Sequence, residues 1–141
     1  MATKSHGYVG TQHDVILPRV GAFILDHVIS FLLGVGIGVA LGLWLESRGA
    51  VYLGALVGLF GYFIVLEGLS GQTIGKRLFG LIVVSRDGTP ITFRQSIARN
   101  LLRMVDGMLN YVVGLVVMLV SQDRQRIGDH VADTLVVRAR R

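Results

Sequence analysis

Residues 20–45 read VGAFILDHVISFLLGVGIGVALGLWL, an apolar run that only Asp26 and His27 interrupt. As an α-helix this run would reach about 39 Å, enough to cross a bilayer core of about 30 Å with some tilt. Pro18 suits the first turn of such a helix. The run begins too late and is too long for a signal peptide, so we expect it to remain in the protein as a spanning helix.

A second apolar run, residues 50–69, follows a tight turn at Glu46 to Gly49. It carries no charged side chain between Arg48 and Glu67, which makes it the clearest spanning candidate in the chain. The two runs predict two transmembrane helices, at residues 20–45 and 50–69.

The composition agrees with a small membrane protein. The chain has 141 residues, enough for one domain, and 16% of them are charged, against about 25% in an average soluble domain. The net charge is +5, but Lys and Arg lie between and beside the apolar runs, which favours orientation in an anionic membrane over nucleic-acid binding. The lack of cysteine excludes disulfides, thiolate metal sites and cysteine nucleophiles.

Residues 78–93 have the pattern of a small β-hairpin. Leu81 to Val84 is a β-type run, Asp87-Gly88 is a strong turn signal, and residues 91–93 could form the return strand. An open sheet edge cannot face lipid, so we expect the hairpin in the cytoplasm. Another β-type run, residues 134–137, could add a third strand, which a two-stranded unit needs for stability.

The third apolar region, residues 97–121, allows two topologies. Gly107 and Asn110 interrupt it, and the stretch from Tyr111 onward is too short to cross a bilayer alone. Basic residues gather after the second run and in the C-terminal tail, whereas the turn between the first two runs holds only Arg48. The positive-inside rule therefore places both termini in the cytoplasm and favours a bent, re-entrant helical pair. A third full crossing is the alternative.

We thus predict a multi-pass cell-membrane protein that is mainly α, with two transmembrane helices, a re-entrant or bent helical pair and a small cytoplasmic sheet. Residues 15–137 would form one membrane domain, between a flexible tail at 1–14 and a basic tail at 138–141. The lipid bilayer is the first expected partner. We expect no cofactor and no metal.

Ionisable side chains within the apolar regions are the most informative residues. Asp26 lies about two turns inside the first helix, where a lipid-facing carboxylate would cost about 2.5–3.5 kcal/mol. Arg19 precedes it on the same helical face, and Arg99 and Arg103 share one face of a later helix. Because unpaired buried charges are too costly to keep, we expect one near-neutral cluster, either ion-responsive or purely structural. Its predicted members are Arg19, Asp26, Glu67, Arg99, Arg103 and Asp106.

Glycines recur every fourth residue in the first helix, at Gly34, Gly38 and Gly42, and the second run contains Gly54 and Gly58. This spacing suits a close helix crossing. We expect these glycines to pack the two helices of one protomer. Contact with a second copy and a glycine-lined substrate path are the alternatives.

Residues 71–77, GQTIGKR, differ from a phosphate-binding loop, because the spacing is wrong and Arg77 replaces the required Ser or Thr. Gly71 and Gly75 are expected to shape the turn out of the second helix. Lys76 and Arg77 are expected at the lipid headgroups.

Asp129 and Asp133 lie four residues apart beside His130, and spacing places no third metal ligand near them. We expect these carboxylates to cap a helix or to pair with Arg124 and Arg126. No nucleophile–base pattern is visible in the sequence, so we do not expect an enzyme.

Together these residues resemble the RDD family of small membrane proteins, named for one arginine and two aspartates. The resemblance covers residues 16–137 and includes Arg19, Asp26, residues 71–81, Val83, Val84, Arg99, Arg103, Asp106 and residues 124–134. Asp106 is our choice for the second aspartate, with Asp129 as the alternative, and Asp133 stands where a small residue is expected. The resemblance implies a membrane location and a role in transport, with sodium–proton exchange linked to some members.

Two functional hypotheses follow. The first is a transport-related protein in which a monovalent cation or a proton acts on the charge cluster. Two crossings are few for an alternating-access carrier, so such a protein should form a homo-oligomer. The second is a non-transporting subunit that docks another membrane protein through its cytoplasmic hairpin and basic tail.

Overall fold

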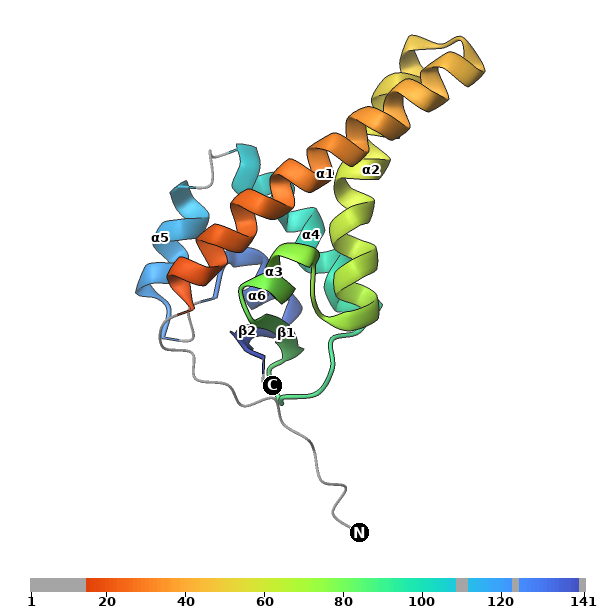
Figure 1. Ribbon diagram of the computed structural model, residues 1–141. Coiled ribbons are helices and arrows are strands. Elements are labelled where there is room, and N and C mark those ends of the chain that lie inside the picture. Colours follow the sequence, from red (N-terminus) through yellow and green to blue (C-terminus); the bar gives the residue numbers. More distant parts are fainter. Residues whose placement is uncertain (1–14, 109–111, 123–124, 140–141) are drawn as a thin grey trace.

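The computed structural model describes residues 15–108, 112–122 and 125–139 (Figure 1), and the tail predicted at 1–14 lies outside these ranges. The protein is mainly helical with one small antiparallel sheet, which confirms the predicted mixture of elements. The elements are α1 (Ile16–Leu45), α2 (Arg48–Ser70), α3 (Ile74–Leu78), β1 (Leu81–Ser85), α4 (Phe93–Met108), α5 (Val112–Val120), α6 (Ile127–Ala132) and β2 (Thr134–Arg138).

A tight turn joins α1 and α2 into a long helical hairpin. Glu46 ends α1 in the left-handed conformation with φ 49°. Ser47 caps α2, because its hydroxyl oxygen accepts the N–H of Ala50 at 3.4 Å. The turn therefore occupies residues 46 and 47, and α2 begins two residues before the predicted run.

Glycines let α1 and α2 approach each other closely. A Cβ on Gly34 or Gly38 would lie 2.8 or 2.6 Å from a backbone carbonyl oxygen of α2. From the other side, a Cβ on Gly54 or Gly58 would lie 2.8 or 2.7 Å from a Cα atom of α1. A Cβ on Gly42 would meet an α2 side chain at 2.2 Å. The four-residue spacing thus serves a helix contact within one protomer.

Both helices of the hairpin are long and apolar enough to cross a membrane. At 1.5 Å per residue, α1 measures about 45 Å and α2 about 35 Å. Only 17% and 28% of the residues in their most apolar stretches are buried inside the protein, so most of these apolar side chains face outward. Leu43 and Trp44, for example, are 76% and 78% exposed. Long helices with exposed apolar side chains fit a membrane protein.

The sheet pairs strands from distant parts of the chain. β1 runs antiparallel to β2, from Leu81 opposite Arg138 to Ser85 opposite Thr134. The predicted return strand at 91–93 is wrong, because residues 91 and 92 form no strand and Phe93 starts α4. The nearest pairing is an isolated bridge between Val84 and Pro90. The C-terminal run, expected as an additional third strand, is the actual partner of β1.

Thr92 and Gln95 explain why residues 91–93 do not form a strand. The Thr92 Oγ1 accepts the Gln95 N–H at 3.3 Å, and the Gln95 Oε1 accepts the Thr92 N–H at 3.0 Å. This reciprocal pair is a capping box, which satisfies N–H groups at a helix start. Consequently α4 begins at Phe93, four residues before the predicted helical region.

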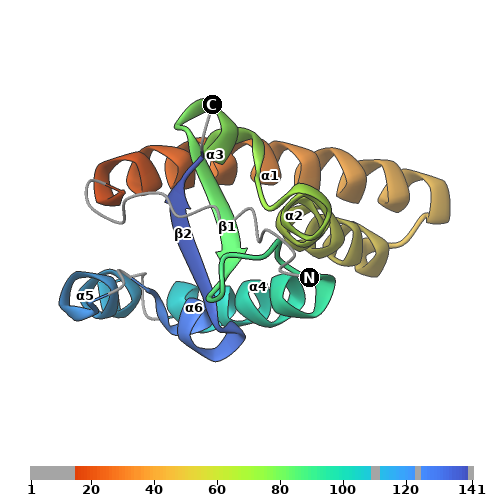
Figure 2. The same cartoon turned by 90° about the horizontal axis from the view of Figure 1, so that it is seen from below.

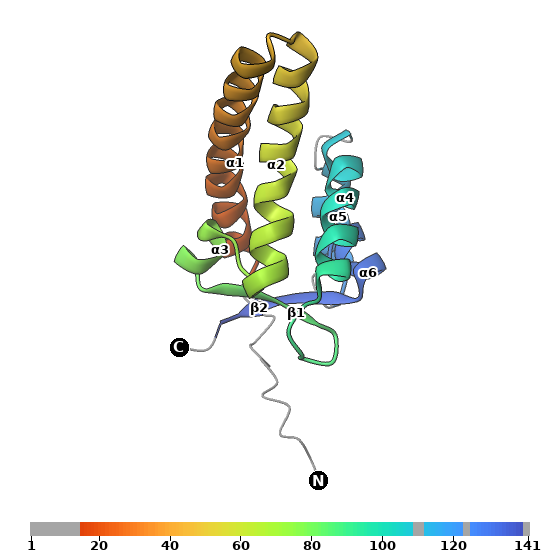
Figure 3. The ribbon, with the colours of Figure 1, turned by 90° about the vertical axis from the view of Figure 1, so that its right-hand side faces the viewer.

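α4 and α5 occupy the region in which a bent helical pair is predicted. Figure 3 shows the pair standing beside the α1–α2 hairpin and reaching only part of its height. The predicted break at Gly107 to Asn110 lies partly outside the described residues, and α4 extends to Met108. β1 precedes α4, and β2 follows α5, so the β1–β2 pairing brings both ends of the helical pair back to one sheet.

The sheet lies across one end of the helices, running from beside α1 and α3 toward α4 and α6 (Figure 2). A small core holds it there, in which Leu81, Val83 and Val136 cluster with Val15 and Ala22 at the start of α1. This core joins the start of α1 to the sheet, while α2 packs against α1 and α4, and α4 packs against α6. The buried charges lie between these elements.

Candidate functional site

Asp26 of α1 is 1% exposed and is held by three uncharged donors. The Tyr62 hydroxyl donates to Oδ1 at 2.6 Å, the Gly75 N–H donates to Oδ1 at 2.8 Å, and the Thr73 hydroxyl donates to Oδ2. A Cβ on Gly75 would lie 2.8 Å from the Asp26 Cγ, so only glycine fits this approach. The backbone N–H of Gly75 therefore holds Asp26 in place. The sequence predicted only a role in the turn for Gly75.

Glu67 of α2 is fully buried and lies among several donors. Lys76 forms an ion pair with its Oε1, and the Asn100 side-chain amide donates to its Oε2 at 3.0 Å. The Arg99 Nε lies 3.4 Å from Oε2 and an Arg103 Nη lies 4.0 Å from Oε1. The Arg103 guanidinium carbon also lies 3.8 Å from the centre of the Phe63 ring, so the guanidinium stacks on this ring while one of its nitrogens faces Glu67.

Lys76 is 7% exposed and reaches inward to Glu67. The prediction that it sits at the lipid headgroups is therefore wrong, whereas Arg77 beside it is exposed. Thr73 explains the difference, because its hydroxyl caps α3 and accepts the Lys76 N–H at 3.3 Å. Burial lowers the pKa of the Lys76 ammonium to about 8 despite the attraction of Glu67.

Asp129 of α6 is also fully buried and binds two arginines. An Arg19 Nη donates to its Oδ2 at 2.8 Å, and the Arg99 Nη2 lies 2.9 Å from its Oδ1. The Arg126 N–H donates to Oδ2 at 3.1 Å, so the carboxylate also caps α6. Burial alone would raise the pKa of Asp129, but the charges of Arg99 and Arg19 hold it well below its usual range.

Arg99 of α4 links the two carboxylates, because its guanidinium lies between Glu67 and Asp129. A Cβ on Gly128 would lie 2.7 Å from the Arg99 carbonyl oxygen, so α6 packs directly on this part of α4. We use the name charge network for the six connected side chains, which are Arg19, Glu67, Lys76, Arg99, Arg103 and Asp129.

The charge network differs from the predicted cluster in its pairing. The sequence places Arg19 and Asp26 on one helical face, but Arg19 bonds Asp129, 110 residues away, and Asp26 takes uncharged donors. Lys76 and Asp129, which the sequence did not predict as members of the cluster, are central members. Asp106 lies on α4, and its side chain falls outside the described part of the chain.

The charges of the network do not balance. It contains four cationic side chains and two carboxylates, all between 0% and 9% exposed. Asp26 lies beside α3, and its carboxylate accepts hydrogen bonds from uncharged donors. Among the residues that the structure describes, no three Asp, Glu or His side chains gather as metal ligands. Ion pairs connect the side chains of the network.

α4 has the reverse polarity of a helix in water. Its polar stripe at i, i+3, i+4 and i+7 is at most 5% exposed and consists of Ser96, Arg99, Asn100 and Arg103. Its apolar side chains face outward, at 41% for Ile97, 52% for Leu101 and 48% for Met104. A helix that buries such a polar stripe and exposes its apolar side chains is suited to lipid surroundings.

Gly71 shapes the exit from α2, as its position in the sequence predicts. It ends the helix at φ 69°, and its carbonyl oxygen accepts the Val83 N–H at 2.8 Å. Asp133, expected to cap or to pair with nearby arginines, instead lies 3.7 Å from Arg86 in an exposed pair. Arg124, the other expected partner, lies outside the described residues.

Sequence reasoning missed three uncharged partners of the buried carboxylates, Tyr62, Thr73 and Asn100. Asn100 could have been predicted, because its position continues the polar stripe that contains Arg99 and Arg103. Thr73 precedes a short helix at a capping position, which is also a local signal. Tyr62 had no such signal, since one tyrosine in an apolar helix is unremarkable.

Comparison with known proteins supports the resemblance seen in the sequence. The chain is 26% identical over 129 residues to the uncharacterized protein YckC of Bacillus subtilis (strain 168), covering 86% of this chain and 82% of that protein. No solved structure matches the chain. The model of the RDD family matches residues 15–133, which include every member of the charge network. This chain belongs to the RDD family.

Proposed function

We propose that this protein crosses the cell membrane twice through α1 and α2, with the sheet and both termini in the cytoplasm. The exposed apolar surface of the α1–α2 hairpin supports the two crossings. The excess of Lys and Arg beside the sheet, against only Arg48 at the opposite turn, supports the orientation.

In this proposal α4 and α5 enter the membrane and return without crossing it. The β1–β2 pairing supports this arrangement, because a third full crossing would separate the two strands across the bilayer. The outward apolar face of α4 supports contact with lipid. Charged side chains of α4 would then lie against α2 and α6, where ion pairs compensate them.

Single-cysteine labelling can test this topology without background, because the chain has no cysteine of its own. Arg48→Cys in the α1–α2 turn should react with a membrane-impermeant maleimide from outside intact cells. Asp87→Cys after β1 and Val131→Cys on α6 should react only after the cells are opened. External labelling of Val131→Cys together with internal labelling of Asp87→Cys would refute the re-entrant pair.

For its activity we propose ion-coupled transport, with a proton or a monovalent cation acting on the charge network in a homo-oligomer. The observation that carries this proposal is the sharing of Arg99 between two buried carboxylates, Glu67 and Asp129. Neutralising one carboxylate would leave Arg99 paired with the other, so the network has more than one arrangement of charge. The pKa of Lys76, about 8, places one proton of this network close to neutral pH.

Flux in proteoliposomes tests this activity. The purified protein should support sodium- or pH-driven flux that Glu67→Gln abolishes, because this substitution removes one of the two carboxylates of the charge network. Asp87→Asn is the matched control, since Asp87 is an exposed loop carboxylate and should leave flux unchanged. Equal flux in wild-type and empty liposomes would reject transport, provided that the reconstituted protein shows its expected topology.

The second candidate is a non-transporting subunit that docks another membrane protein, and it assigns no enzymatic reaction to the chain. The segment between β1 and α4 favours it, because this loop projects from the sheet away from the helices (Figure 3). Arg86, Asp87 and Thr89 in the loop are exposed. A stoichiometric partner that co-purifies with wild type, and is lost when residues 86–90 are replaced by Gly and Ser, would support this candidate.

A further inference from the structure

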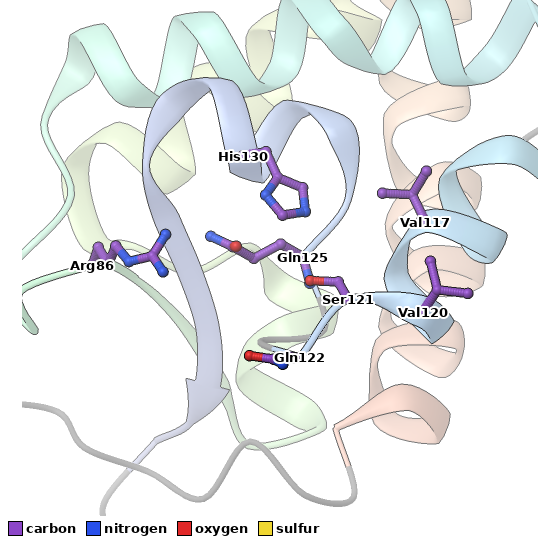
Figure 4. A pocket seen from close by; sticks show the side chains of 7 residues that line it. All are labelled: Arg86, Val117, Val120, Ser121, Gln122, Gln125 and His130. Atoms are coloured by element: carbon purple, nitrogen blue, oxygen red, sulfur yellow. The ribbon is translucent and has the colours of Figure 1, made fainter.

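A groove opens beside the end of α5 and is separate from the charge network (Figure 4). Its volume is about 340 Å³, within the range of about 300–1,000 Å³ that is typical of small-molecule sites. Residues from four regions line it, namely the end of α5, the segment before α6, α6 itself and the segment after β1. The groove therefore lies between the apolar helix α5 and the polar residues beside the sheet.

One side of the groove is apolar and belongs to α5. Val117 and Val120 line this side, and Val120 is 77% exposed. α5 reads VVGLVVMLV and contains no polar side chain, whereas Ser121 and Gln122 follow it immediately. In the proposed membrane placement, this change of polarity puts the groove at the boundary between lipid tails and headgroups.

The other side of the groove is polar and carries a cation. Arg86 lines it from the end of β1, and His130 lines it from α6. The Arg86 N–H donates to the Asp133 carbonyl oxygen at 3.0 Å, which fixes the backbone that bears the guanidinium. The Arg86 side chain lies 3.7 Å from the Asp133 carboxylate, but both are more than half exposed, and exposed pairs are weak. A phosphate in the groove can therefore compete for this guanidinium.

Gln125 lines the groove between these two sides, and hydrogen bonds hold it in place. It is 1% exposed, and its side-chain amide donates to the Thr134 carbonyl oxygen at 2.8 Å. Its N–H donates to the Ser121 hydroxyl oxygen at 3.3 Å, which ties the end of α5 to the segment before α6. The groove is thus held by bonds to β2 and α5 and not by loop side chains alone.

We infer that this groove binds one anionic glycerophospholipid, with its phosphate at Arg86 and an acyl chain along Val117 and Val120. Hydroxyl and amide groups of Ser121 and Gln122 can bond the glycerol part of the headgroup. The juxtaposition of a guanidinium with an apolar helix end matches the two ends of a lipid molecule. This inference rests on the proposed membrane placement and does not depend on transport.

Lipid titration of the full-length protein in detergent tests the inference, with bound lipid counted by native mass spectrometry. Phosphatidylglycerol should bind more tightly than phosphatidylcholine. Arg86→Gln should weaken phosphatidylglycerol binding about tenfold, because a charge-assisted contact to phosphate is lost. Val120→Trp should block both lipids by filling the apolar side. Arg77→Gln, which removes an exposed cation on α3, is the matched control and should bind like wild type.

Two results would overturn the inference. One is equal phosphatidylglycerol binding by wild type, Arg86→Gln and Val120→Trp. The other is binding of glycerol phosphate or inorganic phosphate as tight as that of the lipid, which would indicate a site for free phosphate. Each variant must elute as a single species like wild type, and Val120→Trp changes an exposed residue, so it keeps the test available if Arg86→Gln misfolds. No ion gradient is used, so this result is independent of the flux measurement.

Discussion

The Arg99 Nη2 lies 2.9 Å from the Asp129 Oδ1, and both side chains are 0% exposed. This contact joins α4 to α6. Each residue also has a second partner, since Arg99 faces Glu67 of α2 and Asp129 binds Arg19 of α1. Four helices therefore meet through two residues. Substitution of either residue should therefore weaken the packing of all four helices.

Asp129→Asn should destabilise the protein by about 3–5 kcal/mol, because it leaves Arg19 and Arg99 buried without their shared carboxylate. Thermal unfolding in detergent, followed by the fluorescence of Trp44, would measure the change. Asp133→Asn is the matched control four residues later. Its exposed pair with Arg86 should contribute at most about 1 kcal/mol. Equal effects of the two substitutions would contradict the importance of the buried pair.

Asp129 should also make the protein sensitive to acid. Its pKa in the folded state lies below the unfolded value of about 3.9, so the unfolded chain binds more protons as the pH falls. The stability that Asp129 contributes is fully present above about pH 5 and is lost progressively below about pH 4. As the pH is lowered from about 5, the melting temperature of Asp129→Asn should fall less steeply than that of wild type. A parallel decline would mean that other carboxylates cause the acid sensitivity.

Lys76 should make the stability depend on pH in the alkaline range. Its folded pKa of about 8 lies below the ordinary lysine value of 10.5, so the unfolded chain holds more protons between these values. Stability should therefore rise with pH in this range, by at most about 1.4 kcal/mol per pH unit. Lys76→Arg, which does not titrate there, should lack the rise.

The charges around Lys76 define the result that would contradict this expectation. Glu67 attracts its proton, whereas Arg99 and Arg103 oppose it. If the attraction of Glu67 prevailed over burial, the folded pKa would exceed 10.5 and stability would fall with pH. A larger alkaline decline in wild type than in Lys76→Arg would show this.

Gly38→Ala should disrupt the α1–α2 contact, since the new Cβ would lie 2.6 Å from a backbone oxygen. A cost of about 1–3 kcal/mol is expected for overpacking of this kind. Gly36→Ala is the matched control two residues earlier, where a Cβ meets nothing within 4 Å. It should be neutral or stabilising by up to about 1 kcal/mol, because alanine favours a helix. Equal losses at both sites would argue against the close approach.

Features encoded by neighbouring residues could be predicted from the sequence. The two long helices follow from uninterrupted apolar runs, and the glycine contact follows from a four-residue spacing within one helix. The start of α4 was also predictable, because Thr92 and Gln95 have capping-box spacing, but the Asp-Gly turn signal suggested a strand instead. Competing local signals therefore caused the error in the sheet.

Partner choice within the candidate site could not be predicted in the same way. The sequence indicates that buried charges must be compensated, but it does not specify which carboxylate meets which cation. Arg19 meets Asp129 only because α6 packs on α4 and the sheet holds α1 nearby. Lys76 turns inward because Thr73 starts a short helix immediately before it. Both outcomes depend on packing between elements.

The pairing of β1 with β2 has a consequence for biosynthesis. β2 (Thr134–Arg138) lies far along the chain from β1 (Leu81–Ser85), so β1 is synthesised well before its partner strand. Arg19 is likewise synthesised 110 residues before Asp129, with which it pairs. The α1–α2 hairpin can therefore form before the sheet end of the molecule closes. Nascent chains that stop before β2 should be recognised as unfinished by quality-control proteases.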